Sequence, residues 1–471
     1  MNRRRPFAAV VGAAVLALLS LAGTAASDAT AAEEDRGYIV VLKDSVRSPS
    51  VVAGQQLKRV GGTRTAVYTR AVKGYAATMT PTQATALAGD PQVRFVSPQR
   101  TYRASPPRLP APSPDCRPSP SDRQCQPVFV DRIHADRSST RSGDGSGSVD
   151  VNVAVLDDGI AADVPDLNVR GGVDCLSGSP VVPGLSLVGA GGHGTLVAGI
   201  IGARDDEQGL VGVSPGTPLW AVRVATDDEG LITDAALMCG FDWLLATRSD
   251  ADPGNDIAVA NMSFGSIQPF PPADVDDRRC GTSNQDAIHL AVCNLTAAGV
   301  TAVASAGNDA NDLALSGPAA YDEVIAVTAM ADFDGKPGAK VAPVCYGRDY
   351  GLYGYVDDQT SLEFSNFARS ATDRRHTLAA PGVCVESNSP LPAHHAVGDG
   401  TSFAAPAVSG VLALCIHTHR CGESTPVRNL RTLVHDALAY NRKHPQYGYF
   451  GDPRRPLPQR YYGALIAADR Y

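Results

Sequence analysis

Three features that would point to other classes of protein are missing from this chain of 471 residues. Basic residues are not in excess: 41 Lys and Arg against 49 Asp and Glu give a formal net charge of −8, so nucleic acid is not expected as a partner. The 10 cysteines include no Cys-x-x-Cys pair, which disfavours a structural zinc site. Beyond the N-terminal region no apolar run is long enough to cross a bilayer, so we expect no stable membrane anchor.

The N-terminus has the three parts of a secretory signal peptide. Three arginines at positions 3–5 precede an apolar run over residues 7–26, and small residues follow at positions 29–31. The run is rich in Ala and Gly and short for a membrane span, which favours removal over an uncleaved anchor. We therefore expect residues 1–31 to be a signal peptide and the mature protein to be secreted and extracellular. General secretion is favoured over twin-arginine export, which residues 4–7 suggest only faintly.

The even number of cysteines in an exported chain favours disulfide bonds. Spacing does not fix their connectivity, but short separations favour local pairs, namely Cys116 with Cys125, Cys280 with Cys293, and Cys415 with Cys421. Four cysteines then remain for longer bridges: Cys175, Cys239, Cys345 and Cys384.

Residues 32–105 have the pattern of a small α+β domain. Strand patterns at 38–43, 67–68, 74–79 and 90–96 are separated by helix-like stretches that end at Arg59 and Ala88. The order is strand, helix, strand, strand, helix, strand. Residues 106–127, rich in Pro, Ser and Arg, then read as a linker or as the start of a mature chain.

From Val128 to the C-terminus, apolar strands alternate with Ala-rich helices. We predict strands at residues 151–156, 219–224, 257–262, 300–305 and 324–328, and helices at 193–202, 233–247, 286–298 and 402–417. Near-continuous apolar strands between helices indicate an α/β domain of three layers, with a mainly parallel central sheet covered on both faces. Active sites on such sheets lie at the carboxyl ends of the strands.

Three separate motifs in this region carry the residues of nucleophilic catalysis. Asp157 ends the buried strand pattern of residues 153–157, His193 begins a helix among small residues, and Ser402 lies near the start of a small-residue helix. Each residue alone has an ordinary structural role, as a turn aspartate, a core histidine or an N-cap serine. Together they supply a nucleophile, a base for its proton, and a carboxylate to orient that base.

The three motifs resemble those of the subtilisin-like serine peptidases, the subtilases, in which the triad also runs Asp, His, Ser along the chain. The serine motif is Gly-Thr-Ser-Phe-Ala-Ala-Pro-Ala-Val-Ser-Gly at 400–410, and the histidine motif is Gly-His-Gly-Thr-Leu-Val-Ala-Gly at 192–199. Departures from the family pattern are Phe403 for Met, Ala407 for His, Leu196 for the second His, and Asp158 for the commoner Thr or Ser.

The resemblance implies roles for further residues. Asn308, in the stretch Ala-Gly-Asn after an apolar strand, would donate its amide to the oxyanion, with the backbone N–H of Ser402 as the second donor. The resemblance also implies that two short segments bind the substrate. They would pair with its backbone as an added strand and form the walls of the first specificity pocket. These contain Ser263, Phe264 and Gly265, and Ser305, Ala306 and Gly307.

The resemblance extends to the N-terminal segment and to a cation. The ending Asp90-Pro91-Gln92-Val93-Arg94-Phe95-Val96 looks like that of the inhibitor-type propeptides of subtilases, which template folding and then block the active site. No cofactor is required, although Asp166 and Asp206 match positions near a structural calcium site; a solvated acidic loop is the alternative.

We therefore predict a secreted, monomeric serine endopeptidase that is made as a self-processed zymogen, with residues 128–471 as its catalytic domain. Its partners would be protein or peptide substrates and its own propeptide. One alternative is a non-catalytic relative that only binds peptides, which the retention of all three triad residues disfavours. An esterase of the α/β-hydrolase class is also disfavoured, since residues 400–404 lack its Gly-x-Ser-x-Gly elbow.

Overall fold

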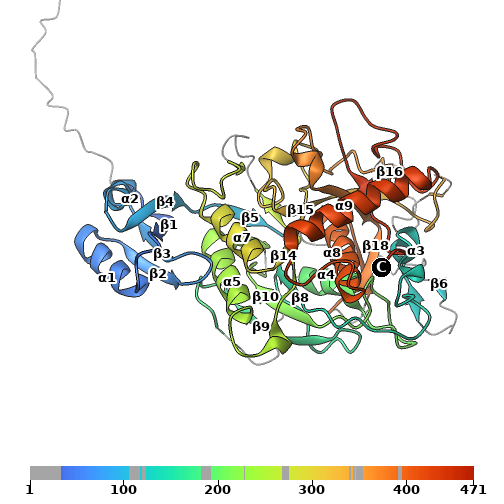
Figure 1. Ribbon diagram of the computed structural model, residues 1–471, viewed down its shortest axis with the longest axis horizontal. Coiled ribbons are helices and arrows are strands. Elements are labelled where there is room, and N and C mark those ends of the chain that lie inside the picture. The colour runs from blue at the N-terminus through green and yellow to red at the C-terminus, as the bar shows by residue number, and fades with distance from the viewer. Residues whose placement is uncertain are drawn as a thin grey trace, which may run out of the picture.

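The computed structural model describes residues 33–104, 117–118, 124–181, 192–227, 229–267, 275–338, 341–342, 345, 354–390 and 395–471. They form a small N-terminal unit beside a larger one, and the junction lies at helices α5 and α7 (Figure 1). Of the described residues, none belongs to a helix that is both long enough and apolar enough to span a membrane.

The small unit has the order of elements that its sequence predicts. Four strands form an antiparallel sheet in the order β2-β3-β1-β4, and two helices pack on it. Its elements are β1 (Arg36–Leu42), α1 (Pro49–Val60), β2 (Thr63–Tyr68), β3 (Gly74–Met79), α2 (Pro81–Ala88) and β4 (Val93–Pro98).

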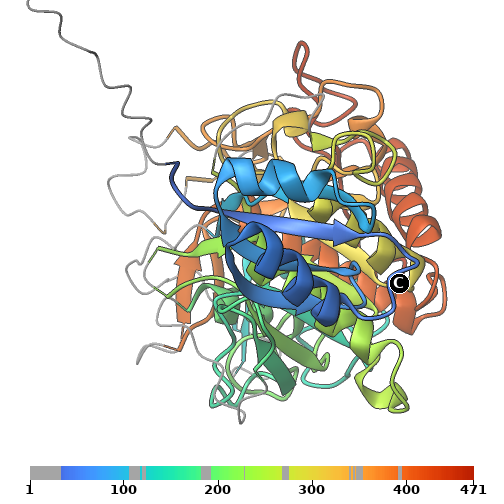
Figure 2. The same ribbon diagram turned by 90° about the vertical axis from the view of Figure 1, so that its left-hand side faces the viewer.

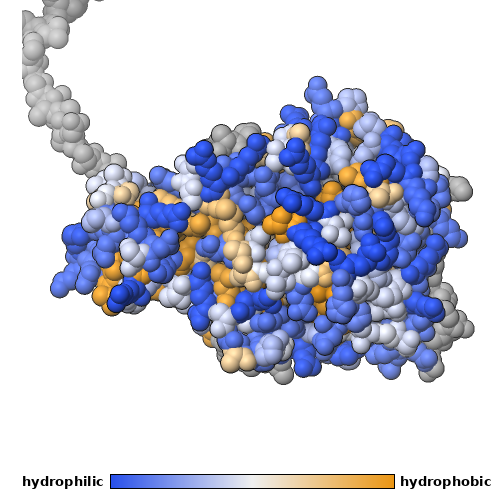
Figure 3. Space-filling view, viewed as in Figure 1, coloured by the Kyte–Doolittle hydropathy of each residue, from blue (hydrophilic) through white to orange (hydrophobic). Residues whose placement is uncertain are grey.

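Side chains alternate across this sheet and bury both of its faces. Tyr38 and Val40 of β1 point into a core shared with α1 and α2. Ile39 and Val41, on the opposite face, pack with residues of α5 and α7 in the large unit. Figure 2 shows the small unit lying across the face of the large one, and apolar surface gathers where the two meet (Figure 3).

The large unit is built on a sheet in the order β20-β17-β15-β14-β12-β8-β10-β9, in which all neighbours run parallel. The short strand β16 (Gln359–Thr360) pairs antiparallel with β15. The strands are β8 (Val153–Asp157), β9 (Val169–Asp174), β10 (Leu219–Arg223), β12 (Val259–Met262), β14 (Thr301–Ser305), β15 (Val324–Ala331), β17 (Thr377–Val383) and β20 (Ala464–Leu465).

Two layers of helices cover this sheet, as predicted for a three-layer domain. On one face α4 (His193–Gly202), α8 (Thr401–His417) and α9 (Pro426–Lys443) share a core with β8 and β17. On the other face lie α5 (Asp234–Thr247) and α7 (Ala287–Ala297). Small elements complete the domain: α3 (Val128–Arg132), the hairpin β18 (Val385–Asn388) with β19 (His395–Gly398), and β6 (Arg117–Pro118) with β7 (Cys125–Gln126).

Four disulfide bonds lie among the described residues. Two are the local pairs that spacing favoured, Cys280–Cys293 and Cys415–Cys421. The remaining cysteines form the longer bridges Cys175–Cys239 and Cys345–Cys384. The predicted partner of Cys125, Cys116, lies outside the described residues.

Candidate active site

Asp157 and His193 form the centre of the site. Asp157 is the last residue of β8, at the carboxyl end of the central sheet, and is fully buried. His193 is the first residue of α4, and its Nδ1 lies 2.9 Å from both carboxylate oxygens of Asp157. The carboxylate therefore fixes the imidazole with Nδ1 as the donor, which leaves Nε2 as the atom that can accept a proton.

Asp158, the residue that departs from the commoner motif, holds the start of α4 in place. Its two carboxylate oxygens accept hydrogen bonds from the backbone N–H groups of His193, at 3.1 Å, and Gly194, at 2.8 Å. These groups have no partner within the helix, so Asp158 acts as a cap supplied from the neighbouring strand end. Burial and the adjacent Asp157 raise the pKa of Asp158 to about 6.

Burial and the two neighbouring carboxylates, Asp157 and Asp158, set the proton affinity of His193. Burial lowers its pKa, but the negative charge of Asp157 and the hydrogen bond to it outweigh burial, and the net pKa of His193 is raised above its ordinary value.

The ring of His193 also meets Phe403 edge to face, with centroids 5.6 Å apart. The aromatic residue that replaces Met in the serine motif thus forms one wall of the histidine site.

Ser402 is the second residue of α8, and the Cα of Gly400 lies at the point where the chain enters this helix. Gly400 has φ of +139°, and a Cβ there would come within 3.1 Å of both Ser402 Oγ and Asn308 Nδ2. A side chain at position 400 would therefore fill the space between these two groups. Ser402 Oγ and His193 Nε2 are both buried, and neither has a hydrogen-bond partner among the described residues.

Pro406 lies inside α8, beyond its first turn. It is the sixth helical residue, so its missing N–H removes the bond that the carbonyl of Ser402 would otherwise accept. Ser263 Oγ donates to that carbonyl instead, at 2.8 Å. Ser263 is in turn held by Asn261, which accepts a hydrogen bond from Ser409 of α8. A buried hydrogen-bonded chain thus ties the start of α8 to β12.

Asn308 is oriented by the start of the same helix. Its Oδ1 accepts from the backbone N–H of Thr401, at 2.9 Å, and from Thr401 Oγ1, at 2.8 Å. With its oxygen engaged in this way, the amide nitrogen is directed to the space near Gly400 and Ser402. A donor amide and the N-terminal N–H groups of α8 therefore face one small region.

Residues of the small unit occupy the cleft beside Ser402. Strand β5 (Thr101–Arg103) lies between β11 (Leu231–Thr233) and β13 (Gly265–Ser266) and pairs antiparallel with both. A cavity of about 210 Å³ follows the end of β5. It is lined by Arg103, Ser263, Phe264, Gly265, Ser266, Ile267, Ser305, Gly307, Asn308, Asp309 and Ser402.

Most of the residues expected to bind substrate lie around this cavity. Gly265 pairs with the backbone of Arg103, and Ser305 Oγ donates to the carbonyl of Phe264. The side chains of Phe264 and Ser305 are nevertheless buried, and Ala306 is fully buried with its carbonyl bonded to Asn366. These residues therefore shape the walls of the cleft chiefly through their backbone.

The two predicted calcium ligands lie near a residue that sequence reasoning missed. Gln124 Nε2 donates to three carbonyl oxygens, those of Arg204, Gln208 and Leu210, at 2.7–3.1 Å. Asp166 accepts from the N–H of Leu210 through Oδ2. Its Oδ1 and the Oε1 of Gln124 are buried without a partner among the described residues.

Asp206 lies on the same loop and contributes negative charge nearby. Its Oδ1 accepts a hydrogen bond from the N–H of Gln208. The pKa of Asp166 is raised to about 6, chiefly by burial and also by the negative charge of Asp206. Three carbonyl oxygens, an amide side chain and two carboxylates therefore gather around one loop. Oxygen ligands of this kind are those that calcium prefers.

Comparison with known proteins agrees with this geometry. The sequence profile of the Subtilase family matches residues 148–450. This chain is a subtilase. The profile of the peptidase inhibitor I9 family matches residues 37–105, so the small unit is an inhibitor-type propeptide.

Similar proteins support the assignment. Subtilisin BL from Lederbergia lenta is 31% identical over 307 residues, which are 65% of this subtilase and 90% of that protein. Subtilisin DY from Bacillus licheniformis is 30% identical over 309 residues, with the same two coverages. The crystal structure of fervidolysin from Fervidobacterium pennivorans, a keratinolytic enzyme related to subtilisin, shares the fold with a TM-score of 0.60 at 21% identity, covering 93% of this chain and 61% of that one.

The family and the relatives make this subtilase a serine endopeptidase with a propeptide. Catalysis in subtilases generally requires no cofactor. The non-catalytic alternative considered from the sequence is not favoured.

Proposed function

We propose that Asp157, His193 and Ser402 are the catalytic triad. The observation that carries this is the contact of His193 Nδ1 with both oxygens of Asp157, which leaves Nε2 as the base. In this mechanism His193 Nε2 takes the proton of Ser402 as its oxygen attacks the substrate carbonyl carbon. The protonated imidazole, stabilised by Asp157, then gives the proton to the leaving amine, and a water repeats the sequence to release the acyl group.

The negative charge that develops on the substrate carbonyl oxygen needs donors. We assign these to the side-chain amide of Asn308 and the backbone N–H of Ser402, at the positive end of α8. Substrate would pair with Ser263–Gly265 as an added strand, and residues 305–307 would line the first specificity pocket. The position of β5 between β11 and β13 supports this binding mode.

The precursor is proposed to divide into a signal peptide, residues 1–31, a propeptide, residues 32–105, a linker or mature N-terminal segment, residues 106–127, and a catalytic domain, residues 128–471. It is exported, cuts itself between the propeptide and the catalytic domain, and acts outside the cell as a monomer. The position of β5 supports self-processing, because its last residue, Arg103, lines the same cavity as Ser402.

The test is Ser402→Ala in the full-length precursor. We expect no hydrolysis of casein and no cleavage near residues 100–110, because the nucleophile is absent. The unchanged precursor, purified in parallel, is the control for maturation. Efficient maturation of the pure Ser402→Ala protein, with no other protease present, would sink the self-processing proposal.

We also propose that the loop at residues 204–210 binds a structural calcium ion. Gln124 and Asp166 would each supply the side-chain oxygen that is now buried without a partner, together with the carbonyls of the loop and Asp206. The ion would neutralise charge and stabilise the fold; it takes no part in the chemistry. Calcium should raise the melting temperature of the Ser402→Ala protein, and Asp166→Asn should abolish that increase.

A further inference from the structure

Arg100 of the propeptide tail sits in a pocket made by two carboxylates of the catalytic unit. Its Nη1 and Nη2 donate to the two oxygens of Asp286 at 2.6 and 2.5 Å. Its Nε donates to Asp234 Oδ2 at 3.3 Å, and its backbone N–H donates to the same oxygen at 3.0 Å. Only 15% of the Arg100 side chain is exposed, so this is a seated side chain and not a surface ion pair.

A second side chain of the tail shares this pocket. Tyr102 is fully buried, its ring meets Phe264 edge to face, and its hydroxyl donates to Asp234 Oδ1 at 2.9 Å. Because Tyr102 lies two residues after Arg100 on an extended chain, both point to the same side of the tail. Thr101 and Arg103, which alternate with them, are exposed.

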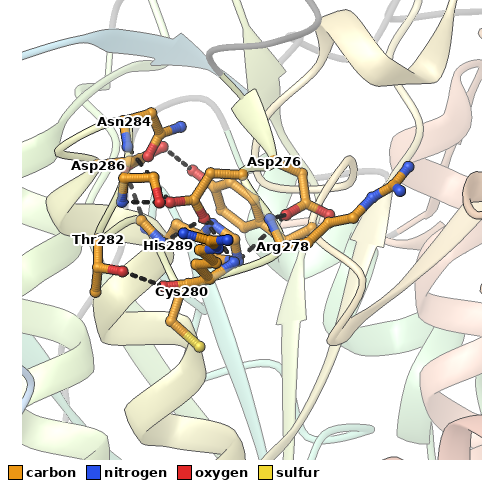
Figure 4. Close-up of polar contacts among 12 residues, drawn as sticks. Asp276, Arg278, Cys280, Thr282, Asn284, Asp286 and His289 are labelled. Carbon is orange, nitrogen blue, oxygen red and sulfur yellow. Dashed lines mark hydrogen bonds and ion pairs between the residues drawn. The ribbon is translucent and has the colours of Figure 1, made fainter.

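The catalytic unit holds the carboxylate of Asp286 in position through its own hydrogen bonds. Asp286 caps α7, where its Oδ1 accepts from the N–H groups of Ile288 and His289 at 3.0 and 3.1 Å. The hydroxyl of Tyr321 donates to Asp286 Oδ2, and the ring of His289 stacks on Tyr321 with centroids 4.2 Å apart. Figure 4 shows Asp286 and His289 at this end of α7 among the polar contacts of the preceding loop.

Asp234 is placed by its position at the start of a helix, and its carboxylate accepts hydrogen bonds from Arg100 and Tyr102 of the tail. It is the first residue of α5, fully buried, and its backbone N–H donates to the carbonyl of Arg100. Both carboxylates therefore lie at helix N-termini, the positive ends of the helix dipoles. When the propeptide leaves, these two carboxylates lose the guanidinium and the phenol that now satisfy them, and their positions in the cleft remain.

We infer that Asp234 and Asp286 form a binding pocket for an arginine side chain of the substrate, two residues before an aromatic residue that fills the site of Tyr102. This makes the mature enzyme selective for substrates with the pattern Arg-x-Tyr ahead of the cleaved bond. The inference rests on the proposed catalytic site, since the pocket matters for substrates only if they follow the path of the tail. Guanidinium binds such a pair of carboxylates through several charge-assisted hydrogen bonds, which gives both affinity and geometry.

The test uses the mature enzyme and three acetylated hexapeptide p-nitroanilides. The reference, Arg-Thr-Tyr-Arg-Ala-Ser, has the sequence of residues 100–105. In the test peptide the first Arg is replaced by Gln, and in the matched control the second Arg, which corresponds to exposed Arg103, is replaced by Gln. We expect kcat/KM to fall about 10- to 100-fold for the first replacement, as for the loss of charge-assisted hydrogen bonds, and to change less than about 3-fold for the second.

A variant of the enzyme tests whether the preference for the first Arg depends on the charge of Asp286. Asp286→Asn keeps a residue that can cap α7 but removes the charge, so the ratio of rates for the reference and test peptides should fall toward one. Equal rates for the two peptides with the unmodified enzyme, or equal losses at both arginines, would overturn the pocket. Binding of the same peptides as free acids can be measured by calorimetry, which requires no catalytic activity. Equal affinities for the reference and test peptides would also overturn the pocket. Failure to cleave any peptide, by contrast, would count against the triad.

Discussion

Replacement of Ser263 by Ala tests whether the start of α8 depends on a donor from β12. Pro406 has no N–H, so the carbonyl of Ser402 receives no hydrogen bond from within the helix. The hydroxyl of Ser263 donates to this carbonyl instead, at 2.8 Å. Loss of that hydroxyl leaves two buried polar groups without a partner, the carbonyl of Ser402 and the Nδ2 of Asn261. Each such group costs about 1–3 kcal/mol, so Ser263→Ala should destabilise the fold by about 2–6 kcal/mol.

Pro406→Ala offers a selective rescue. An alanine there regains the N–H that can donate to the carbonyl of Ser402, but it does nothing for Asn261. Combined with Ser263→Ala, it should therefore recover about 1–2 kcal/mol beyond its own effect in the unmodified chain. A double-mutant cycle isolates this coupling from the helix propensity of the new alanine.

The four proteins should be compared in a Ser402→Ala background, so that none can digest itself. The free energies are best read from unfolding rates in guanidinium, since precursors with several disulfides can unfold irreversibly. The expected coupling means that the double variant should unfold about 5- to 30-fold more slowly than the sum of the two single effects predicts. Strictly additive effects would refute the idea that Ser263 replaces the helical bond lost at Pro406.

Three further outcomes follow from the site and the fold. Asn308→Ala should lower kcat by about 10²–10³ while changing KM little, because the donor acts on charge that develops in the transition state; a rise in KM alone in steady-state assays would make Asn308 a ground-state binding residue. Activity of the mature enzyme should fall as the pH drops through the raised pKa of His193, since the protonated ring cannot act as the base, and a rate profile that stays flat down to pH 5 would contradict this. Reductant should lower the melting temperature, because each native bridge contributes about 2–4 kcal/mol, and free thiols at most positions by mass spectrometry would exclude it.

The fold could be predicted where the apolar pattern is continuous. Strands β8, β10, β12, β14 and β15 are buried in the middle of the sheet, and their sequences are almost entirely apolar. The edge strand β9 was missed because Arg170, Gly171 and Gly172 interrupt it and only Val173 is well buried. Helix α9 was missed although Leu430, Leu433, Val434 and Ala437 follow a helical spacing, since polar and charged residues together make up most of the rest of it.

The site could be predicted only as far as local motifs reach. Asp157, His193 and Ser402 each lie in a short stretch whose neighbours identify it. Gln124 lies in a proline-rich segment with no motif, and its contacts are made with a loop about 80 residues away, so nothing local marks it. The role of Asp158 is similar, because its partners are the N–H groups of a helix that begins 35 residues later.

Affinity and inhibition by the propeptide come from separate surfaces. The sheet of the small unit packs its apolar face on α5 and α7, and Asp242 of α5 accepts hydrogen bonds from three successive N–H groups, those of Thr69, Arg70 and Ala71. None of these contacts involves the triad. Only the tail, as β5, lies along the cleft. The sheet therefore raises the local concentration of a tail that itself binds through its backbone and through the side chains of Arg100 and Tyr102, and the proposed cut would free the cleft once the short tail dissociates.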